Sequence, residues 1–310
     1  MSRYLLNNDF DVEYPEGKKF AIVLTHDVDD VYVKLQHVFS SPLNCIRYGN
    51  YRGIIPILKG KINKKKSPYI NFQNIINLEE KYNAKSTFYF LVNPQDTLGY
   101  KYYTFDLKNE IIKILDRGCE IGYHTGYEVY NNIKGIIKEK KILEELTGNA
   151  IIGARNHFLR FKTPDSWNVL AKAGFQYDSS FHYNDMVGFR NGMCHPFYPF
   201  DLNKNSIIKI LEIPIVVSDI AFRSFMKINA VESWKYIKQL IDVTEKNKGV
   251  LTVLWHTWTF SYPVSIAGWF GKEWTCLYEK ILKYAIEKNA WLTNCKELWS
   301  YTTKEGLFRK

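Results

Sequence analysis

The stretch Phe20-Ala-Ile-Val-Leu-Thr-His-Asp-Val-Asp-Asp30 begins as an uninterrupted apolar run and ends in three carboxylates. A short continuous apolar run is typical of a strand that is buried on both faces, as in a parallel sheet. If the extended backbone continues into the acidic end, alternation places Asp27 and Asp29 on the same face. Two carboxylates that close repel each other unless a cation or a shared proton separates them. The stretch therefore predicts a buried strand that leads into a metal site, with a solvated Asp-rich turn as the alternative.

Five further apolar runs of strand length follow, and stretches with helical periodicity lie between them. The runs are 86–92, 119–124, 150–155, 210–217 and 250–256, and the helical stretches lie near 72–82, 105–117, 133–147, 164–173, 230–247 and 273–288. Repeated strand-helix units imply parallel strands with helical crossovers, and so an α/β fold that is either a barrel or a doubly wound sheet.

Polar residues at the ends of these runs favour the barrel. His124, Arg155 and His256 each lie at the carboxyl end of a predicted strand, as the acidic end of the first stretch does. In a barrel, these ends converge on one mouth. We therefore expect a distorted (β/α) barrel of about seven parallel strands.

The 310 residues contain no run of Pro, Gly and Ser that indicates a flexible linker. We expect one domain over residues 1–310, with a partly helical insertion at about 35–68. We find no apolar run long enough for a transmembrane helix and no signal peptide in the sequence as given. The five cysteines are odd in number and widely spaced, with no Cys-x-x-Cys. They favour a reducing compartment, so we expect a cytoplasmic protein.

The formal net charge is +10, which attracts anions in general. The densest basic stretch is 59–66, at the end of the expected insertion. It is suited to an acidic glycan, an anionic lipid or a nucleic acid, or it is simply a solvated loop. Because this stretch is the one feature that favours nucleic acid, we expect no nucleic-acid partner. The sequence leaves the oligomeric state open.

Four side chains complete the chemistry that the first stretch suggests. His124 is followed four residues later by Glu128, which together with the aspartates gives a mixed nitrogen and oxygen site suited to zinc or another first-row divalent ion. Arg155 carries a fixed guanidinium fork that can hold Asp27 ionised, or it pairs with a surface carboxylate. His256 can titrate near neutrality and act as a general acid.

Two tryptophans flank this last histidine. Trp255 and Trp258 suit the apolar face of a sugar ring, although at least one of them is expected in the core. Farther back in the chain, Arg190 either binds an anionic part of a substrate or ties down its own loop. We therefore take these three residues as candidates for substrate binding.

In their order over roughly residues 20–260, these motifs resemble the polysaccharide deacetylase family, the NodB-homology fold of carbohydrate esterases. Thr25-His-Asp-Val-Asp29 resembles the family's Asp-x-Asp variant of a first motif that usually reads Thr-Phe-Asp-Asp-Gly. By this resemblance Asp27 is the catalytic base and Asp29 a metal ligand. Arg155 orders the base, and Leu254-Trp-His256 places the general acid. The expected divalent cation is Zn²⁺, with Co²⁺ or Ni²⁺ as alternatives.

The second motif departs from the family pattern. His-(Ser/Thr)-x-x-His is met by His124-Thr125, but Glu128 stands where the second histidine is expected. Either this carboxylate is the third ligand or another group completes the site, and His157 is the nearest candidate. The family's penultimate motif, which usually carries an Asp, is only loosely suggested by Glu212-Ile-Pro214 and Asp219.

The resemblance implies a metal-dependent hydrolase that acts on a carbon–nitrogen bond outside peptides. Its expected substrate is an N-acetylated amino sugar of a polysaccharide or of a precursor. Two other functions fit the same sequence: a catalytically inactive barrel that binds glycans, and a hydrolase of linear or cyclic amides that are not sugars.

Overall fold

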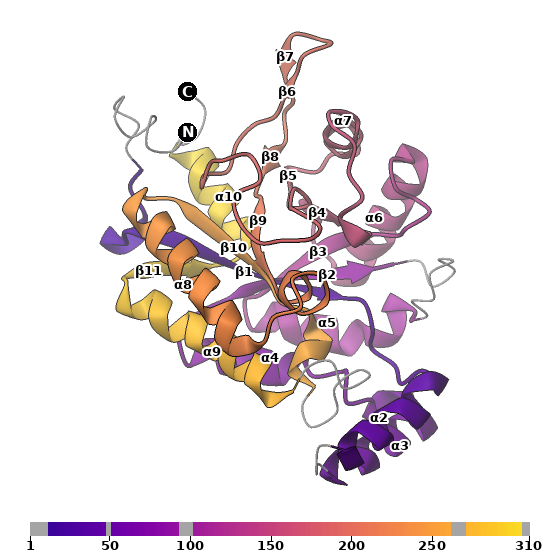
Figure 1. The fold of residues 1–310 in the computed structure, drawn as a ribbon. Coiled ribbons are helices and arrows are strands. Elements are labelled where there is room, and N and C mark those ends of the chain that lie inside the picture. The colour runs from indigo at the N-terminus through magenta and orange to yellow at the C-terminus, as the bar shows by residue number, and fades with distance from the viewer. Residues whose placement is uncertain (1–11, 48–50, 93–101, 262–270, 306–310) are drawn as a thin grey trace.

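Nine parallel strands form the main sheet, eight of them in one continuous order, and the computed structural model describes residues 12–47, 51–92, 102–261 and 271–305 (Figure 1). The strands follow one another in the order β8-β5-β4-β3-β2-β1-β10-β9, and β11 also pairs with β1. Their bounds are β1 (Phe20–Val28), β2 (Ser86–Leu91), β3 (Glu120–Thr125), β4 (Gly153–Asn156), β5 (Tyr177–Asp178), β8 (Leu211–Glu212), β9 (Ile215–Ser218), β10 (Val250–Leu254) and β11 (Ala290–Thr293).

The first and last strands of this order, β8 and β9, follow each other directly in the sequence. Strands β8 and β9 pair with β5 and β10, respectively, yet only Ile213 and Pro214 separate them. The predicted strand 210–217 is therefore two short strands, because proline has no N–H to donate to a sheet ladder. This interrupted run joins the edges of the sheet, which confirms the distorted barrel but gives eight parallel strands in this order where about seven were predicted.

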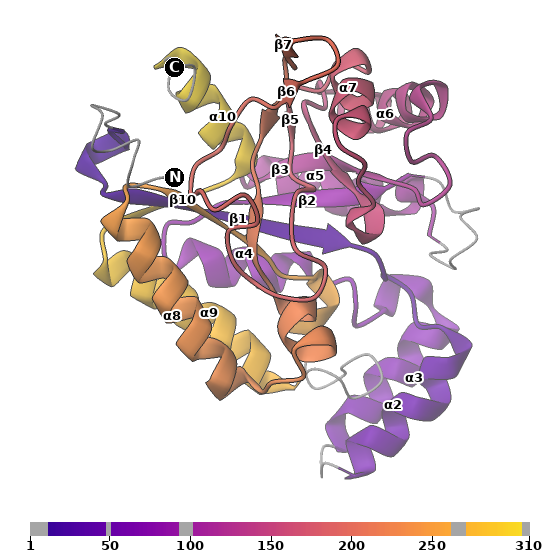
Figure 2. The same cartoon turned by 45° about the horizontal axis from the view of Figure 1, so that its top comes forward.

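Helices surround the strands (Figures 1 and 2). They are α2 (Leu35–Arg47), α3 (Ile54–Ile62), α4 (Phe72–Glu80), α5 (Lys108–Asp116), α6 (Ile133–Thr147), α7 (Asp165–Lys172), α8 (Ala230–Lys246), α9 (Lys272–Glu287) and α10 (Cys295–Lys304), and a short antiparallel pair, β6 (Phe200–Asp201) and β7 (Ser206–Ile207), lies outside the main sheet. Helix α9 buries a stripe at three- and four-residue spacing, from Trp274 to Ala285. Helix α8 begins at a capping box between Asn229 and Glu232, which satisfies backbone donors of its first turn.

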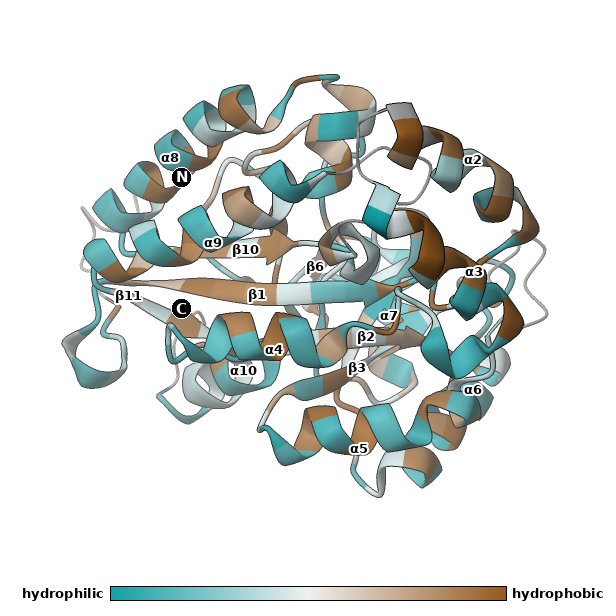
Figure 3. Ribbon diagram, turned by 90° about the horizontal axis from the view of Figure 1, so that it is seen from below, coloured by the Kyte–Doolittle hydropathy of each residue, from teal (hydrophilic) through white to brown (hydrophobic). Residues whose placement is uncertain are grey.

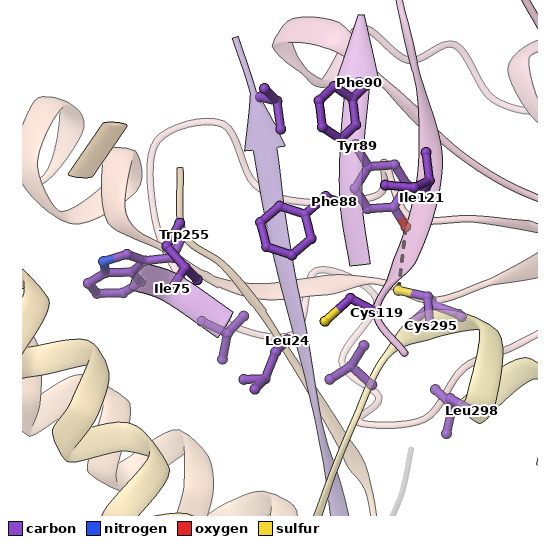
Figure 4. Packing of buried hydrophobic residues seen from close by; sticks show 14 of the residues in the cluster. Leu24, Ile75, Phe88, Tyr89, Phe90, Cys119, Ile121, Trp255, Cys295 and Leu298 are labelled. Carbon is purple, nitrogen blue, oxygen red and sulfur yellow. Dashed lines mark hydrogen bonds between the residues drawn. The ribbon is translucent and has the colours of Figure 1, made fainter. Parts of the chain in front are cut away.

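Strand β2 shows how the core supports the carboxyl ends of the strands. Phe88 and Phe90 pack against Phe72 of α4. Tyr89 points to the opposite face, and its hydroxyl donates to Cys295 Sγ across 3.4 Å (Figure 4). The guanidinium of Arg155 lies 4.2 Å from the centroid of the Tyr89 ring. A packed aromatic layer therefore lies directly beneath one of the predicted site residues.

The predicted insertion contains two helices, α2 and α3, which follow β1 and stand beside the carboxyl end of that strand (Figures 1 and 2). Gly60 allows α3 to come close to its surroundings, because a Cβ there would lie 2.9 Å from Ser67 Cα and from Pro68 Cδ. His37 of α2 is buried beside Tyr69, with Nδ1 3.3 Å from the tyrosine hydroxyl. We call residues 35–66 the helical hairpin.

Two of the expectations about the whole chain are tested by the described residues. None of the five cysteines forms a disulfide bond. Among the described helices, none combines the length and apolar character that a bilayer crossing requires.

Candidate active site and metal centre

Three residues that could ligate a metal converge at the carboxyl ends of β1, β3 and β4. Asp29, His124 and His157 each offer one ligand atom, and these atoms all lie within 4.8 Å of one another. Asp29 Oδ1 is 3.4 Å from His124 Nε2 and 3.7 Å from His157 Nε2. All three residues are buried. One carboxylate and two imidazoles are a donor set that suits zinc and other first-row divalent ions.

The hydrogen bonds around His124 leave one of its nitrogens for a ligand. Its Nδ1 lies 2.9 Å from the carbonyl oxygen of Arg155, so the Nδ1–H donates to that oxygen and Nε2 keeps its lone pair. Neither His124 Nε2 nor Asp29 Oδ1 has a hydrogen-bond partner among the described residues, although both atoms are buried. Buried polar atoms without partners are costly. A cation between them would account for both.

Glu128, the expected third ligand, lies elsewhere. Its side chain is exposed in the turn after β3, and it is not among the residues that converge on Asp29. His157, which was the alternative third ligand, contacts that aspartate instead. The reason is local: β3 ends at Thr125, so the chain has left the strand before residue 128, whereas residue 157 follows directly on β4.

Asp27 is held from one side by Arg155. The guanidinium Nη1 donates to Asp27 Oδ1 across 2.7 Å and to the hydroxyl of Thr25 across 3.0 Å. Its other two nitrogens donate to the carbonyl and hydroxyl oxygens of Ser179, each across 2.8 Å. Ser179 thus fixes this arginine. The other carboxylate oxygen of Asp27 faces His124 Nε2 at 3.6 Å.

His256 lies on the opposite side of the metal-ligand group. Its Nε2 is 3.5 Å from Asp29 Oδ2, and its Nδ1 is 2.7 Å from Asp219 Oδ1. The second oxygen of Asp219 accepts from the backbone N–H of His256 and from the hydroxyl of Thr259. Asp219 is fully buried, so the pair fixes both the tautomer and the orientation of the ring.

The site holds its charges in definite states. Burial alone would raise the pKa of Asp27, but Arg155 and the neighbouring imidazoles outweigh burial and hold it below its ordinary value. The pKa of Asp29 is likewise lowered, against burial, by the imidazoles around it. For His256, burial opposes the charged form, but Asp219 dominates and raises the pKa to about 9. Two ionised carboxylates therefore face an imidazolium.

A cavity of about 560 Å³ opens in front of these groups. Its lining includes Asp27, Asp29, His157 and His256, together with aromatic side chains of Phe158, Phe225 and Trp258. A volume of this size admits a small ligand or one or two sugar rings. The convergent polar groups therefore lie at the end of a pocket rather than on an open surface.

The three predicted substrate-binding residues have different positions. Trp258 lines the cavity. Trp255 is fully buried and packs against Trp274 and Tyr278, so it belongs to the core. Arg190 is exposed and ties down its own loop, since its Nη1 donates to the carbonyl oxygen of His182 across 2.7 Å.

Two residues of the cavity, each with a buried polar atom, were not predicted from the sequence. The Nδ1–H of His182 donates to the carbonyl oxygen of Ile215 across 2.9 Å, and its buried Nε2 has no partner among the described residues. Ser224 Oγ is also buried and without a partner there. Both residues line the cavity. No motif pointed to them, because a lone histidine and a lone serine carry no signal of their own.

No family model matches the sequence, and no curated protein matches it either. The structure is similar to that of a protein from Mycobacterium smegmatis assigned as a polysaccharide deacetylase, with a TM-score of 0.62 and 17% identity over 96% of this chain and 94% of that one. It is also similar to the GH57 branching enzyme TK1436 of Thermococcus kodakaraensis, with a TM-score of 0.50 and 9% identity over 91% of this chain and 71% of that one. The comparison with BA3943, a CE4 family pseudoenzyme from Bacillus anthracis, gives a TM-score of 0.49 and 12% identity over 92% of this chain and 66% of that one. The first likeness confirms the predicted polysaccharide deacetylase fold.

Proposed function

We propose that this protein is a metal-dependent hydrolase that removes an acyl group, most simply acetyl, from an N-acylated amino sugar of a polysaccharide or its precursor. One observation carries the proposal. A buried carboxylate paired with arginine and an imidazole paired with aspartate lie on two sides of an Asp-His-His group, at the end of a cavity. This arrangement provides a base, an acid and a cation site around one point.

Asp29, His124 and His157 would hold the cation, with Zn²⁺ favoured and Co²⁺ or Ni²⁺ as alternatives. The two buried unpartnered atoms, Asp29 Oδ1 and His124 Nε2, fit a metal because both are lone-pair donors that face each other at 3.4 Å. When bound, the cation supplies Lewis-acid polarisation of the acyl carbonyl and makes a nearby water more acidic.

Asp27 is the proposed general base. Arg155 keeps its carboxylate ionised and oriented, so Asp27 Oδ2 is available to accept a proton from the attacking water. The same guanidinium is anchored on Ser179, which holds it in place beside the carboxylate.

His256 is the proposed general acid. In its protonated form, which Asp219 favours, it can give its Nε2 proton to the departing amine, which would otherwise leave as a poor anionic leaving group. Asp219 stabilises the imidazolium before transfer and holds Nδ1 throughout. A base and an acid on two sides of the scissile bond are what amide hydrolysis requires.

The lining of the cavity supports a sugar as the substrate. Trp258 and Phe158 offer aromatic faces, while His182 and Ser224 offer buried polar atoms that no described residue satisfies. A sugar ring presents an apolar C–H face and several hydroxyls, so it can meet both kinds of group. An amide without hydroxyls would leave those polar atoms unsatisfied.

The decisive experiment is Asp27→Asn, assayed on N-acetylated amino sugars. We expect turnover to be lost while Zn²⁺ binding, measured by calorimetry, stays close to that of the wild type. Asp165→Asn, on the exposed surface of α7, is the matched control and should keep full activity. Deacetylation that persists in the Asp27 variant would contradict the assigned base. A wild-type protein that binds Zn²⁺ but cleaves no such sugar would favour the glycan-binding barrel.

A further inference from the structure

The helical hairpin exposes a concentration of large apolar side chains. Those on α2 are spaced by four, four and three residues, and those on α3 by three and four, so each helix presents one apolar stripe. The side chains are between 44% and 88% exposed and comprise Leu35, Phe39, Leu43 and Ile46 on α2, Ile55, Leu58 and Ile62 on α3, and Tyr51 between the helices. Figure 3 shows brown segments along both helices. Exposed apolar surface gathered in this way marks a site of interaction.

The hairpin has another face that accounts for its own packing. On α2, His37, Ser41 and Cys45 follow one another at four-residue spacing and are buried. On α3, Ile57 is fully buried and Gly60 lies against Ser67 and Pro68. The buried faces therefore pack the helices against the rest of the protein, and the exposed apolar stripes remain free to contact a partner outside it.

The net charge of the helical hairpin limits the class of partner that can bind there. Residues 35–66 contain seven lysines and arginines and no aspartate or glutamate. The cations are Arg47, Arg52, Lys59, Lys61, Lys64, Lys65 and Lys66, and all five lysines are exposed. A second copy would bring the same positive charge to the interface, which opposes pairing. Nucleic acid would satisfy the charge but not the aliphatic stripes.

An anionic bilayer satisfies both features. Helices with an apolar stripe and basic neighbours lie in the plane of the membrane interface, with the apolar side chains buried below the headgroups and the lysines near lipid phosphates. Helix α2 has 13 residues and so spans about 20 Å, short of a bilayer core of about 30 Å. The hairpin would therefore lie on a membrane and not cross it.

The hairpin begins close to the active site. Leu35 starts α2 directly after Lys34, whose Nζ lies 2.7 Å from Asp30 Oδ1. Asp30 lines the cavity, as do Phe158 and Phe225, which are 52% and 53% exposed. A membrane that contacts the hairpin would therefore lie next to the rim of the cavity.

We infer that the exposed stripes and lysines of the helical hairpin dock this protein on an anionic lipid bilayer, and that its substrate is an acylated amino sugar carried at the membrane surface. The second part rests on the proposed function, whereas the docking does not. The substrate class follows because Asp30, which lines the cavity, lies five residues before the first helix of the hairpin, so a docked membrane lies beside the cavity.

Docking is tested with the full chain and sedimented vesicles. We expect the protein to sediment with vesicles of equal parts phosphatidylglycerol and phosphatidylcholine and to stay in solution with phosphatidylcholine alone. Phe39→Ser with Leu43→Ser should weaken binding by about tenfold for each side chain removed. Lys61→Glu with Lys65→Glu should weaken it by at least about fivefold for each lysine.

Matched controls change the same properties elsewhere. Leu202→Ser with Ile207→Ser removes two exposed apolar side chains beside the β6–β7 pair, and Lys134→Glu with Lys138→Glu makes the same charge change on α6. Both controls should bind vesicles like the wild type. Docking is overturned if the wild type stays in solution with both kinds of vesicle, or if the controls weaken binding as much as the hairpin variants do. A wild-type dimer in sedimentation equilibrium that Phe39→Ser with Leu43→Ser converts to monomer would instead assign the stripes to a second copy.

The substrate is tested on two forms of one sugar. An N-acetylglucosaminyl lipid held in the mixed vesicles should be deacetylated at least about tenfold more slowly by the Phe39 and Leu43 double variant, while soluble N-acetylglucosamine oligomers are cleaved at the wild-type rate. Equal rates on both forms would overturn the membrane-borne substrate. If the wild type cleaves neither form, the proposed function fails. Vesicle binding then still decides the docking, because binding requires no catalysis. Asp27→Asn should bind vesicles like the wild type.

Discussion

His256 Nδ1 lies 2.7 Å from Asp219 Oδ1, and the backbone N–H of His256 donates to the other oxygen of the same carboxylate. The two residues are 37 positions apart and come from the ends of neighbouring strands, β10 and β9. Asp219 is fully buried, so its negative charge acts on the imidazole with little screening by water. It is a positioning residue for the proposed acid.

Asp219→Asn tests this role. The amide cannot stabilise the imidazolium, so we expect kcat to fall by about 10²-fold or more while KM changes little. Thr259→Val, which removes the hydroxyl that donates to Asp219 but keeps the carboxylate, should lower kcat much less. Steady-state kinetics on an N-acetylated amino sugar measure both. A rise in KM with unchanged kcat would show that Asp219 serves substrate binding instead.

His157→Gln and Glu128→Gln separate the two candidates for the third metal ligand. Because His157 Nε2 faces Asp29 and Glu128 is exposed, we expect the first change to lower Zn²⁺ affinity by more than about 100-fold and the second to leave it unchanged. Calorimetric titration of each apoprotein with Zn²⁺ gives the affinity independently of activity. The reverse order of effects would return the ligand role to Glu128.

His182→Phe tests the polar lining of the cavity. The change removes the unpartnered Nε2, an acceptor suited to a sugar hydroxyl, while it keeps an aromatic ring of similar size. We expect KM for the sugar to rise about tenfold, the effect of losing one hydrogen bond to a neutral partner. His182→Gln, which retains an acceptor, should recover part of the loss. An unchanged KM in both variants would place the substrate elsewhere in the cavity.

The buried carboxyl of Glu120, which is not one of the proposed catalytic groups, should make the stability of the protein depend on pH. Burial raises the pKa of this carboxyl to about 7, although Thr87 and Tyr177 both donate to it. The native state therefore retains a proton that the unfolded chain loses above its ordinary pKa of 4.5. Stability from this group is present below that value and is lost as the pH rises towards 7, by an amount of order 3 kcal/mol.

Urea unfolding of the wild type and of Glu120→Gln between pH 4 and pH 8 measures this contribution. The free energy of unfolding of the wild type should fall over the interval more steeply than that of the variant, which cannot titrate at this position. Parallel curves would show that the pKa of Glu120 is the same in the native and the unfolded states, and would contradict the prediction.

Local sequence accounts for much of the barrel and for several residues of the candidate site. The apolar run at 20–24 predicts a buried strand, and strand β1 places Asp27 and Asp29 together beside His124, as alternation requires. The order of strands and helices predicts an α/β barrel, because parallel strands need crossover helices. Arg155 was predicted to hold Asp27, and it lies 2.7 Å from that carboxylate.

What the sequence by itself determined is the set of chemical groups and the strand ends that carry them. The tertiary structure decided which groups meet. Glu128 was the expected third ligand and His157 the alternative, but Glu128 is exposed in the turn after β3, whereas His157 follows β4 directly and lies beside Asp29. Asp219 contacts His256 because β9 and β10 pair in the sheet, although the two residues are 37 positions apart in the chain. After the end of β10, Trp255 joins the core, whereas Trp258 lines the cavity. Spacing along a chain fixes local direction, whereas distances between strands depend on how the whole sheet closes.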